Sequence, residues 1–183
     1  LTHTQSAFGA EFDSLSDMVS FGAAPSLVIY EWALKDLGRL GWIAAFIYCA
    51  SAALRLARFN TTLEVVDKRY FQGLPSPAAA ALVAGFVWVM IASGLAGHEV
   101  RWLACGLTIF GGVTMVSNIR FYSFKDINLR KSVPFFVVAG IALGFALISL
   151  SPEMALFGFF VVYGLSGYVM AAINLGRRKP PAG

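Results

Sequence analysis

Three residues near the start of the chain have a spacing that could support metal chemistry. Gly9, Asp13 and Asp17 are four residues apart, so on an α-helix they share one face, about one turn from each other. Two ionised carboxylates this close repel each other, and their charge is costly where a helix enters a membrane. A divalent cation such as Mg²⁺ removes both penalties and leaves room for phosphate oxygens. We therefore predict that Asp13 and Asp17 bind metal.

A simpler interpretation is that the two aspartates only begin a solvated helix. The helix dipole favours acidic side chains in the first turns, and the spacing alone does not exclude this. Gly9 favours the metal interpretation, because a residue without a side chain one turn before Asp13 leaves a gap for a phosphate or a nucleotide.

The composition places these residues in a membrane protein. Of the 183 residues 58% are hydrophobic and 13% are charged, which is more apolar surface than a soluble domain of this size can bury. Cys49 and Cys105 lie far apart within apolar runs and form no CxxC pair, so they indicate neither a metal site nor a redox motif. The expected surroundings are a lipid bilayer, and no nucleic-acid partner is expected.

Six apolar runs are close to the roughly 20 residues that a helix needs to cross a bilayer. They are residues 9–34, 40–58, 77–97, 102–118, 133–150 and 154–175. All six are predicted to be α-helical, because single strands leave backbone groups unpaired in lipid. The predicted fold class is therefore all-α, a polytopic helical membrane protein with one domain over residues 1–183. The stretch 73–77 is predicted to be a rigid turn that leads into the third helix.

Lysine and arginine predict the orientation, because cytoplasmic ends of spanning helices are rich in both. If the first helix starts in the cytoplasm, only Lys35, Arg39 and Arg101 fall on the outer side. The basic residues on or near the cytoplasmic side are then Arg55, Arg58, Lys68, Arg69, Arg120, Lys125, Arg130, Lys131, Arg177, Arg178 and Lys179. This orientation puts Asp13 and Asp17 near the cytoplasmic surface.

The glycine and the two aspartates also carry a family resemblance. Their GxxxDxxxD spacing resembles the second half of the signature of CDP-alcohol phosphatidyltransferases, and Ser6 stands where that family has a hydroxyl residue. The first half, with two more aspartates, is expected just before Leu1, together with two helices that raise the total to about eight. The segments that resemble the phosphatidylserine-forming branch are ALRLARFN (53–60), FQGLPSPA (71–78) and VSNIRFYSFK (116–125).

The resemblance implies an activity and a set of ligands. The family transfers a phosphatidyl group from CDP-diacylglycerol to an alcohol, here L-serine, and releases CMP. Asp13 would bind two ions, Mg²⁺ or Mn²⁺, and Asp17 would bind one of them and take the proton of the hydroxyl group. Ser6, Gly9 and Asp13 would hold CDP-diacylglycerol. The implied setting is a homodimer in the inner membrane of a bacterial or archaeal cell, with the site facing the cytoplasm. Without the other aspartates, the chain is expected to be inactive alone.

A site for serine needs a partner for its carboxylate, and arginine binds carboxylates through two parallel hydrogen bonds. Arg58 and Arg120 are the main candidates, with Asn118 and Lys125 near the same cytoplasmic helix ends. Arg55, Lys125 and Lys131 are weaker candidates than these two arginines. The alternative is that these residues only set the topology or contact anionic lipid.

Other functions stay open at this point. The same chemistry could use choline, glycerol phosphate or inositol, although a choline site would favour aromatic side chains. A cation-coupled transporter would also carry carboxylates, but near the middle of the bilayer rather than at one surface. A structural scaffold would explain the glycines within the helices, but not Ser6, Gly9, Asp13 and Asp17 together.

Overall fold

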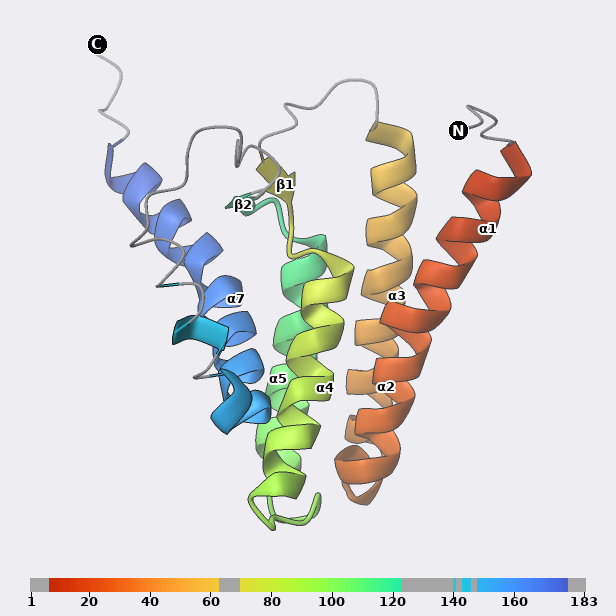
Figure 1. Ribbon diagram of the computed structural model, residues 1–183. Coiled ribbons are helices and arrows are strands. Elements are labelled where there is room, and N and C mark those ends of the chain that lie inside the picture. Colours follow the sequence, from red (N-terminus) through yellow and green to blue (C-terminus); the bar gives the residue numbers. More distant parts are fainter. Residues whose placement is uncertain (1–6, 63–69, 123–139, 141–142, 146–147, 178–183) are drawn as a thin grey trace.

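The computed structural model describes residues 7–62, 70–122, 140, 143–145 and 148–177, and its long elements are helices that run along a common direction (Figure 1). The elements are α1 (Ala7–Asp17), η1 (Met18–Ala23), α2 (Ala24–Ile29), η2 (Tyr30–Leu34), η3 (Lys35–Leu37), α3 (Arg39–Thr62), β1 (Tyr70–Gln72), α4 (Ser76–Ala92), α5 (Arg101–Val116), β2 (Arg120–Tyr122) and α7 (Pro152–Arg177). The start of α1 and the end of α7 lie at the same end of the bundle.

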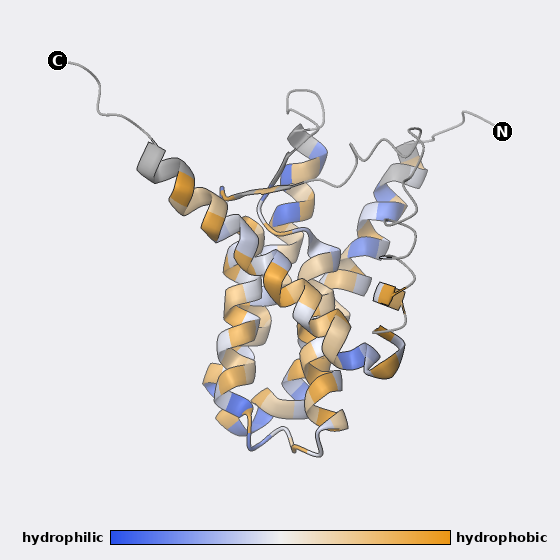
Figure 2. Cartoon of the chain, turned by 60° about the vertical axis from the view of Figure 1, so that its left-hand side comes forward, coloured by the Kyte–Doolittle hydropathy of each residue, from blue (hydrophilic) through white to orange (hydrophobic). Residues whose placement is uncertain are grey.

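The predicted all-α membrane fold is confirmed. The segments Arg39–Asn60 and Pro152–Ile173 are long and apolar enough to span a bilayer, with mean hydropathies of 1.6 and 1.9, and α4 and α5 are shorter apolar helices. Many large apolar side chains along the bundle are exposed. Hydrophobic residues cover the middle of the bundle, and hydrophilic residues gather toward its two ends (Figure 2). A soluble protein would not expose so much apolar surface, whereas lipid tails cover it at no cost.

Most of the predicted spans correspond to observed helices, with two differences in detail. The third span ends at Ala92 rather than at Gly97, because Gly94 has a φ of 74° and closes the helix. The first span is one continuous helical stretch, but η1 and η2 within it are π-helical rather than α-helical. The fifth span, residues 133–150, lies mostly outside the described residues, and its described parts at 140, 143–145 and 148–150 are helical.

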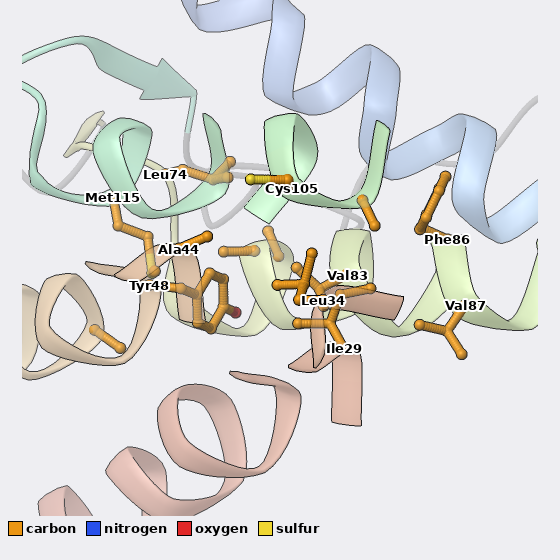
Figure 3. Close-up of a cluster of buried hydrophobic side chains, with 14 of the residues drawn as sticks. Ile29, Leu34, Ala44, Tyr48, Leu74, Val83, Phe86, Val87, Cys105 and Met115 are labelled. Carbon is orange, nitrogen blue, oxygen red and sulfur yellow. The ribbon is translucent and has the colours of Figure 1, made fainter. Parts of the chain in front are cut away.

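Close packing around α3 forms the interior of the bundle. α3 packs mainly against α5, and α4 packs mainly against α7. Where α3 meets α5, a Cβ atom on Gly112 would lie 3.1 Å from the Cα of Tyr48. The two backbones can come this close because glycine has no side chain. Figure 3 shows Tyr48, Leu34 and Val83 within the buried cluster, and all three side chains are fully buried.

A two-stranded sheet joins the two long connections, which is a feature that the sequence analysis did not predict. β1 and β2 are antiparallel, with Tyr70 opposite Tyr122 and Gln72 opposite Arg120. Phe121 is fully buried, and a Cβ atom on Gly167 of α7 would lie 2.5 Å from its ring. This contact fastens the sheet to α7, at the end of the bundle where α3 and α5 finish (Figure 1).

The turn predicted within 73–77 is observed at 73–75, and it is tied to the end of α5. α4 begins at Ser76, directly after the turn. The N–H of Gly73 donates to the carbonyl oxygen of Ile119 at 2.8 Å, and the N–H of Leu74 donates to that of Thr114 at 3.1 Å. The second bond satisfies a carbonyl group in the last turn of α5, which has no partner within its own helix.

The opposite end of the bundle carries an ion pair. The Lys35 ammonium group donates to the Glu31 carboxylate, with 2.5 Å between Nζ and Oε1. This hydrogen bond, helped by the charge of the carboxylate, raises the pKa of Lys35. The pair is exposed, so its contribution to stability is small.

We expect Gly73→Ala to destabilise the protein more than Gly94→Ala. Both glycines have a positive φ, 76° and 74°, so both substitutions strain the backbone by a similar amount. A Cβ atom on Gly73 would also lie 2.1 Å from the carbonyl oxygen of Met115, whereas nothing lies within 4 Å of one on Gly94. Gly73→Ala should therefore lower the free energy of unfolding by about 1–3 kcal/mol more than Gly94→Ala does, and this difference should be visible as a lower Tm in detergent. Equal Tm values for the two variants would contradict the close approach at Gly73.

Candidate active site

The two aspartates predicted to bind metal lie on α1, one helical turn apart. Asp13 is exposed and Asp17 is half-buried, so the pair runs from solvent toward the interior of the bundle. Gly9 lies one further turn toward the start of the helix and is exposed. The structure therefore places these three residues as the spacing predicted.

The π-helical stretch after Asp17 is held firmly against α3. The Tyr48 hydroxyl group donates to the carbonyl oxygen of Phe21 at 3.1 Å. A Cβ atom on Gly22 would lie 3.0 Å from the Cβ of Ala52, so η1 and α3 are in close contact there. Short π-helical turns are frequent at functional sites, where they change the direction of the side chains that follow or precede them. Here the turn fixes the chain immediately after Asp17.

A second contact joins α1 to the end of α3. The amide group of Asn60 donates from Nδ2 to the hydroxyl oxygen of Ser14, at 3.0 Å. Ser14 lies between the two aspartates in the sequence. The chain that carries the carboxylates is thus attached to α3 at two places: at Ser14, between the two aspartates, and at Phe21, after Asp17.

Arg58 and Asn118, both predicted to bind serine, lie together in one hydrogen-bonded cluster. Arg58 Nη2 donates to Asn118 Oδ1 at 2.7 Å and to Gln72 Oε1 at 2.5 Å. Gln72 lies in β1 and Asn118 lies just before β2, so one arginine of α3 holds both sides of the small sheet. Sequence reasoning did not select Gln72, although it occurs in the segment 71–78 that carries the resemblance.

The other predicted site residues are described less fully by the structure. Arg120 lies in β2 opposite Gln72, which places its backbone beside the same cluster. The side chain of Arg120 is not among those described, and Ser6 and Lys125 lie outside the described residues.

Arg55 has a more central position than its sequence ranking implied. It lies on α3 one turn before Arg58, and its Nη1 donates to the hydroxyl oxygen of Ser76 at 3.0 Å. The Asp17 carboxylate and the Tyr163 hydroxyl group lie within its electrostatic range. The three-residue spacing from Arg58 was the available signal, because it puts both arginines on one side of the helix. Among these polar residues, Arg55 is the one whose charge interacts with that of Asp17.

The donor set of this region fits part of a metal site. No three histidine, cysteine, aspartate or glutamate side chains come together to hold a metal ion within the described part of the chain. Asp13 and Asp17 supply two carboxylates, which suit a hard cation such as Mg²⁺. Such a cation keeps several water molecules and takes substrate phosphates as ligands, so two protein carboxylates are a reasonable partial set.

Comparison with known proteins gives a consistent result. A model of the family described as CDP-alcohol phosphatidyltransferase matches residues 1–113. A CDP-diacylglycerol–serine O-phosphatidyltransferase of Helicobacter pylori (strain J99) is 34% identical over 176 residues, which cover 96% of this chain and 73% of the relative. A protein of the same name from Methanocaldococcus jannaschii is 34% identical over 92% of this chain and 74% of its own length.

A more distant relative agrees with these two. The protein of the same name from Mycobacterium leprae is 29% identical over 164 residues, which cover 87% of this chain and 54% of the relative. The residues that match the family model include Gly9, Asp13, Asp17 and Arg58.

Proposed function

The chain belongs to the CDP-alcohol phosphatidyltransferase family, and from this premise we propose that it transfers the phosphatidyl group of CDP-diacylglycerol to the hydroxyl group of L-serine. The products are phosphatidylserine and CMP. The observation that carries this proposal is the similarity, over nearly the whole chain, to bacterial and archaeal relatives that are named for serine.

The reaction is a displacement at phosphorus. The serine oxygen forms a bond to the phosphorus atom of the phosphatidyl group, and the bond from that phosphorus to the bridging oxygen of the diphosphate breaks. CMP leaves with the bridging oxygen. We propose that Asp17 accepts the proton of the serine hydroxyl group during the attack and later releases it to water. A carboxylate is a weak base, but it needs to act only as the new bond forms.

Members of this family use divalent metal ions, and we propose that Asp13 and Asp17 hold two of them, Mg²⁺ or Mn²⁺. Bound there, the ions would neutralise the diphosphate and hold it for in-line displacement. Asp13 would contact both ions and Asp17 one. Aspartates that the family resemblance places before Leu1 would complete the set, which stays a prediction. Gly9 and Ser6 are proposed to lie against the CDP-diacylglycerol head group.

The protein is a membrane protein, and we propose that its site faces the cytoplasm of a bacterial or archaeal cell. The last part of α3, which carries Arg55 and Arg58, lies at the end of the bundle where α1 begins (Figure 1). This agrees with the rule that basic residues face the cytoplasm. The same end would receive serine from the cytoplasm and CDP-diacylglycerol from the bilayer. A homodimer is proposed from the family resemblance alone.

We expect the purified full-length enzyme to prefer L-serine among possible acceptors. The test supplies radioactive L-serine, ethanolamine, choline, glycerol phosphate or inositol with CDP-diacylglycerol and measures both labelled lipid and released CMP. Lipid formed from serine, in amounts equal to CMP, is the expected result. Efficient transfer to another acceptor with none to serine would assign the same chemistry to a different product.

We expect Asp13→Asn and Asp17→Asn each to abolish transfer in the full-length enzyme. Each variant removes a proposed metal ligand, and the second also removes the proposed base. Manganese binding, followed by electron paramagnetic resonance, should weaken in parallel. Glu11→Gln is the matched control, because Glu11 is an exposed carboxylate on the same helix, off the face of the two aspartates. Near-normal activity of either aspartate variant would refute the metal site.

We expect that replacing the relevant arginine, in Arg58→Ala or in Arg120→Ala, raises the KM for serine by about 10–100-fold, the effect of losing a charged hydrogen bond of about 1.5–3 kcal/mol. The KM for CDP-diacylglycerol should change much less. Lysine at position 58 should restore only part of the affinity, since an ammonium group cannot make two parallel bonds. Arg101→Ala, at the opposite end of the bundle, serves as the control. A normal serine KM in both variants would leave neither arginine as a serine ligand.

A further inference from the structure

We propose that Arg55 is a substrate-binding residue whose guanidinium group takes an oxyanion of a substrate beside Asp17. The inference rests on the proposed function, because it concerns the same site. It adds a residue that the family signature does not contain and that the sequence analysis ranked below its neighbours.

Arg55 occupies a partly buried position near the proposed site. The side chain starts from α3 and is half-buried. Its neighbours are Ser76 at the start of α4, Tyr163 on α7 and Asp17 on α1. A cation at this depth must keep a partner, since an uncompensated charge away from water is costly.

The partners that Arg55 has do not neutralise its charge. Its hydrogen bond to Ser76 reaches a neutral hydroxyl group, which is almost fully buried. Within the described part of the chain, the only ion pair closer than 4 Å is the one between Lys35 and Glu31, at the far end of the bundle. Asp17 is therefore near enough to attract Arg55 but does not pair with it there.

The hydrogen-bonding groups of Arg55 are also incompletely used. Its Nε atom is shut off from water and has no hydrogen-bond acceptor among the described residues. Leaving such an N–H without a partner costs about 1–3 kcal/mol. Nε and Nη2 form the side of the guanidinium group that binds a carboxylate or a phosphate through two parallel bonds. An oxyanion would supply both the missing acceptor and the missing negative charge.

The proposed reaction brings two such oxyanions next to Asp17. One is the serine carboxylate, because Asp17 is proposed to face the hydroxyl group of the same small molecule. The other is the diphosphate of CDP-diacylglycerol, because Asp17 is proposed to hold a metal ion against it. Both have oxygen atoms that a guanidinium group binds well, so the shared chemistry is that of an anionic oxygen pair.

A purely structural role is the competing explanation. In that case Arg55 only ties α3 to α4 through Ser76, and removing either side chain breaks the same hydrogen bond. Ser76→Ala should then reproduce the effects of Arg55→Met. If Arg55 binds substrate, Ser76→Ala should instead be mild, because it leaves the charge and the Nε–Nη2 side in place. The apolar methionine should also leave Tm nearly unchanged, since a similar volume replaces a poorly compensated cation.

The experiment compares Arg55→Met, Arg55→Lys and Ser76→Ala in the full-length enzyme. It measures the KM of serine, the KM of CDP-diacylglycerol, kcat and the Tm in detergent. We expect Arg55→Met to raise one of the two KM values by about 10–100-fold, with partial recovery in Arg55→Lys and a change of less than about threefold in Ser76→Ala.

Two further measurements identify which oxyanion Arg55 binds. A higher KM for serine, together with a weaker preference for serine over ethanolamine, assigns Arg55 to the carboxylate, because ethanolamine lacks one. A higher KM for CDP-diacylglycerol, together with weaker binding of that lipid in the absence of acceptor, assigns Arg55 to the diphosphate. The inference is wrong if Arg55→Met changes neither KM by more than about twofold. It is also wrong if Ser76→Ala raises the same KM as much as Arg55→Met does.

The failure of this inference differs from the failure of the proposed function. If the wild-type enzyme does not use serine, the proposed function is wrong, and the binding of CDP-diacylglycerol to Arg55→Met still decides the inference. In that case unchanged binding overturns it. If the wild-type enzyme uses serine but Arg55→Met behaves normally, only the inference is lost.

Discussion

The close approach of backbones on two sides of α3 is the constraint on which the site depends. On one side Gly22 of η1 comes against Ala52, and on the other Gly112 of α5 comes against Tyr48. In lipid the hydrophobic effect does not drive helices together, so close packing at small residues must do much of this work. Because α3 is held from both sides, the polar residues at its end have fixed positions relative to α1 and α5.

Three polar residues near the end of α3 reach different parts of the protein. Asn60 contacts α1, Arg58 contacts both sides of the small sheet, and Arg55 contacts the start of α4. The candidate site is thus assembled around one helix, even though its residues come from distant parts of the sequence. This arrangement explains why the two aspartates alone, which lie on one face of a single helix, do not define the site.

The sequence predicted those parts of the structure that depend on local patterns. Apolar runs indicated the spans, and the spacing of Asp13 and Asp17 placed both on one face. The π-helical turns were not predictable in this way, because MVSFGA has the composition of an ordinary apolar helix and its geometry depends on packing against α3.

The two strands have three residues each, too few to show an alternating pattern. The importance of Arg55 depends on its contact with Ser76, 21 residues away, which no local pattern reveals.

The two ends of the bundle differ in how their charges are paired. At one end Glu31 and Lys35 form an ion pair, so their charges are satisfied within the protein. At the other end Asp13, Asp17 and Arg55 form no such pair in the described part of the chain, although the guanidinium group lies in the field of Asp17. Keeping opposite charges close but unpaired is unfavourable in a free protein. In the function proposed above, divalent cations on the carboxylates and a substrate anion on the arginine would give each charge a partner. The proposed metal and substrate sites would then support each other, since each ligand would screen the charge that repels the other.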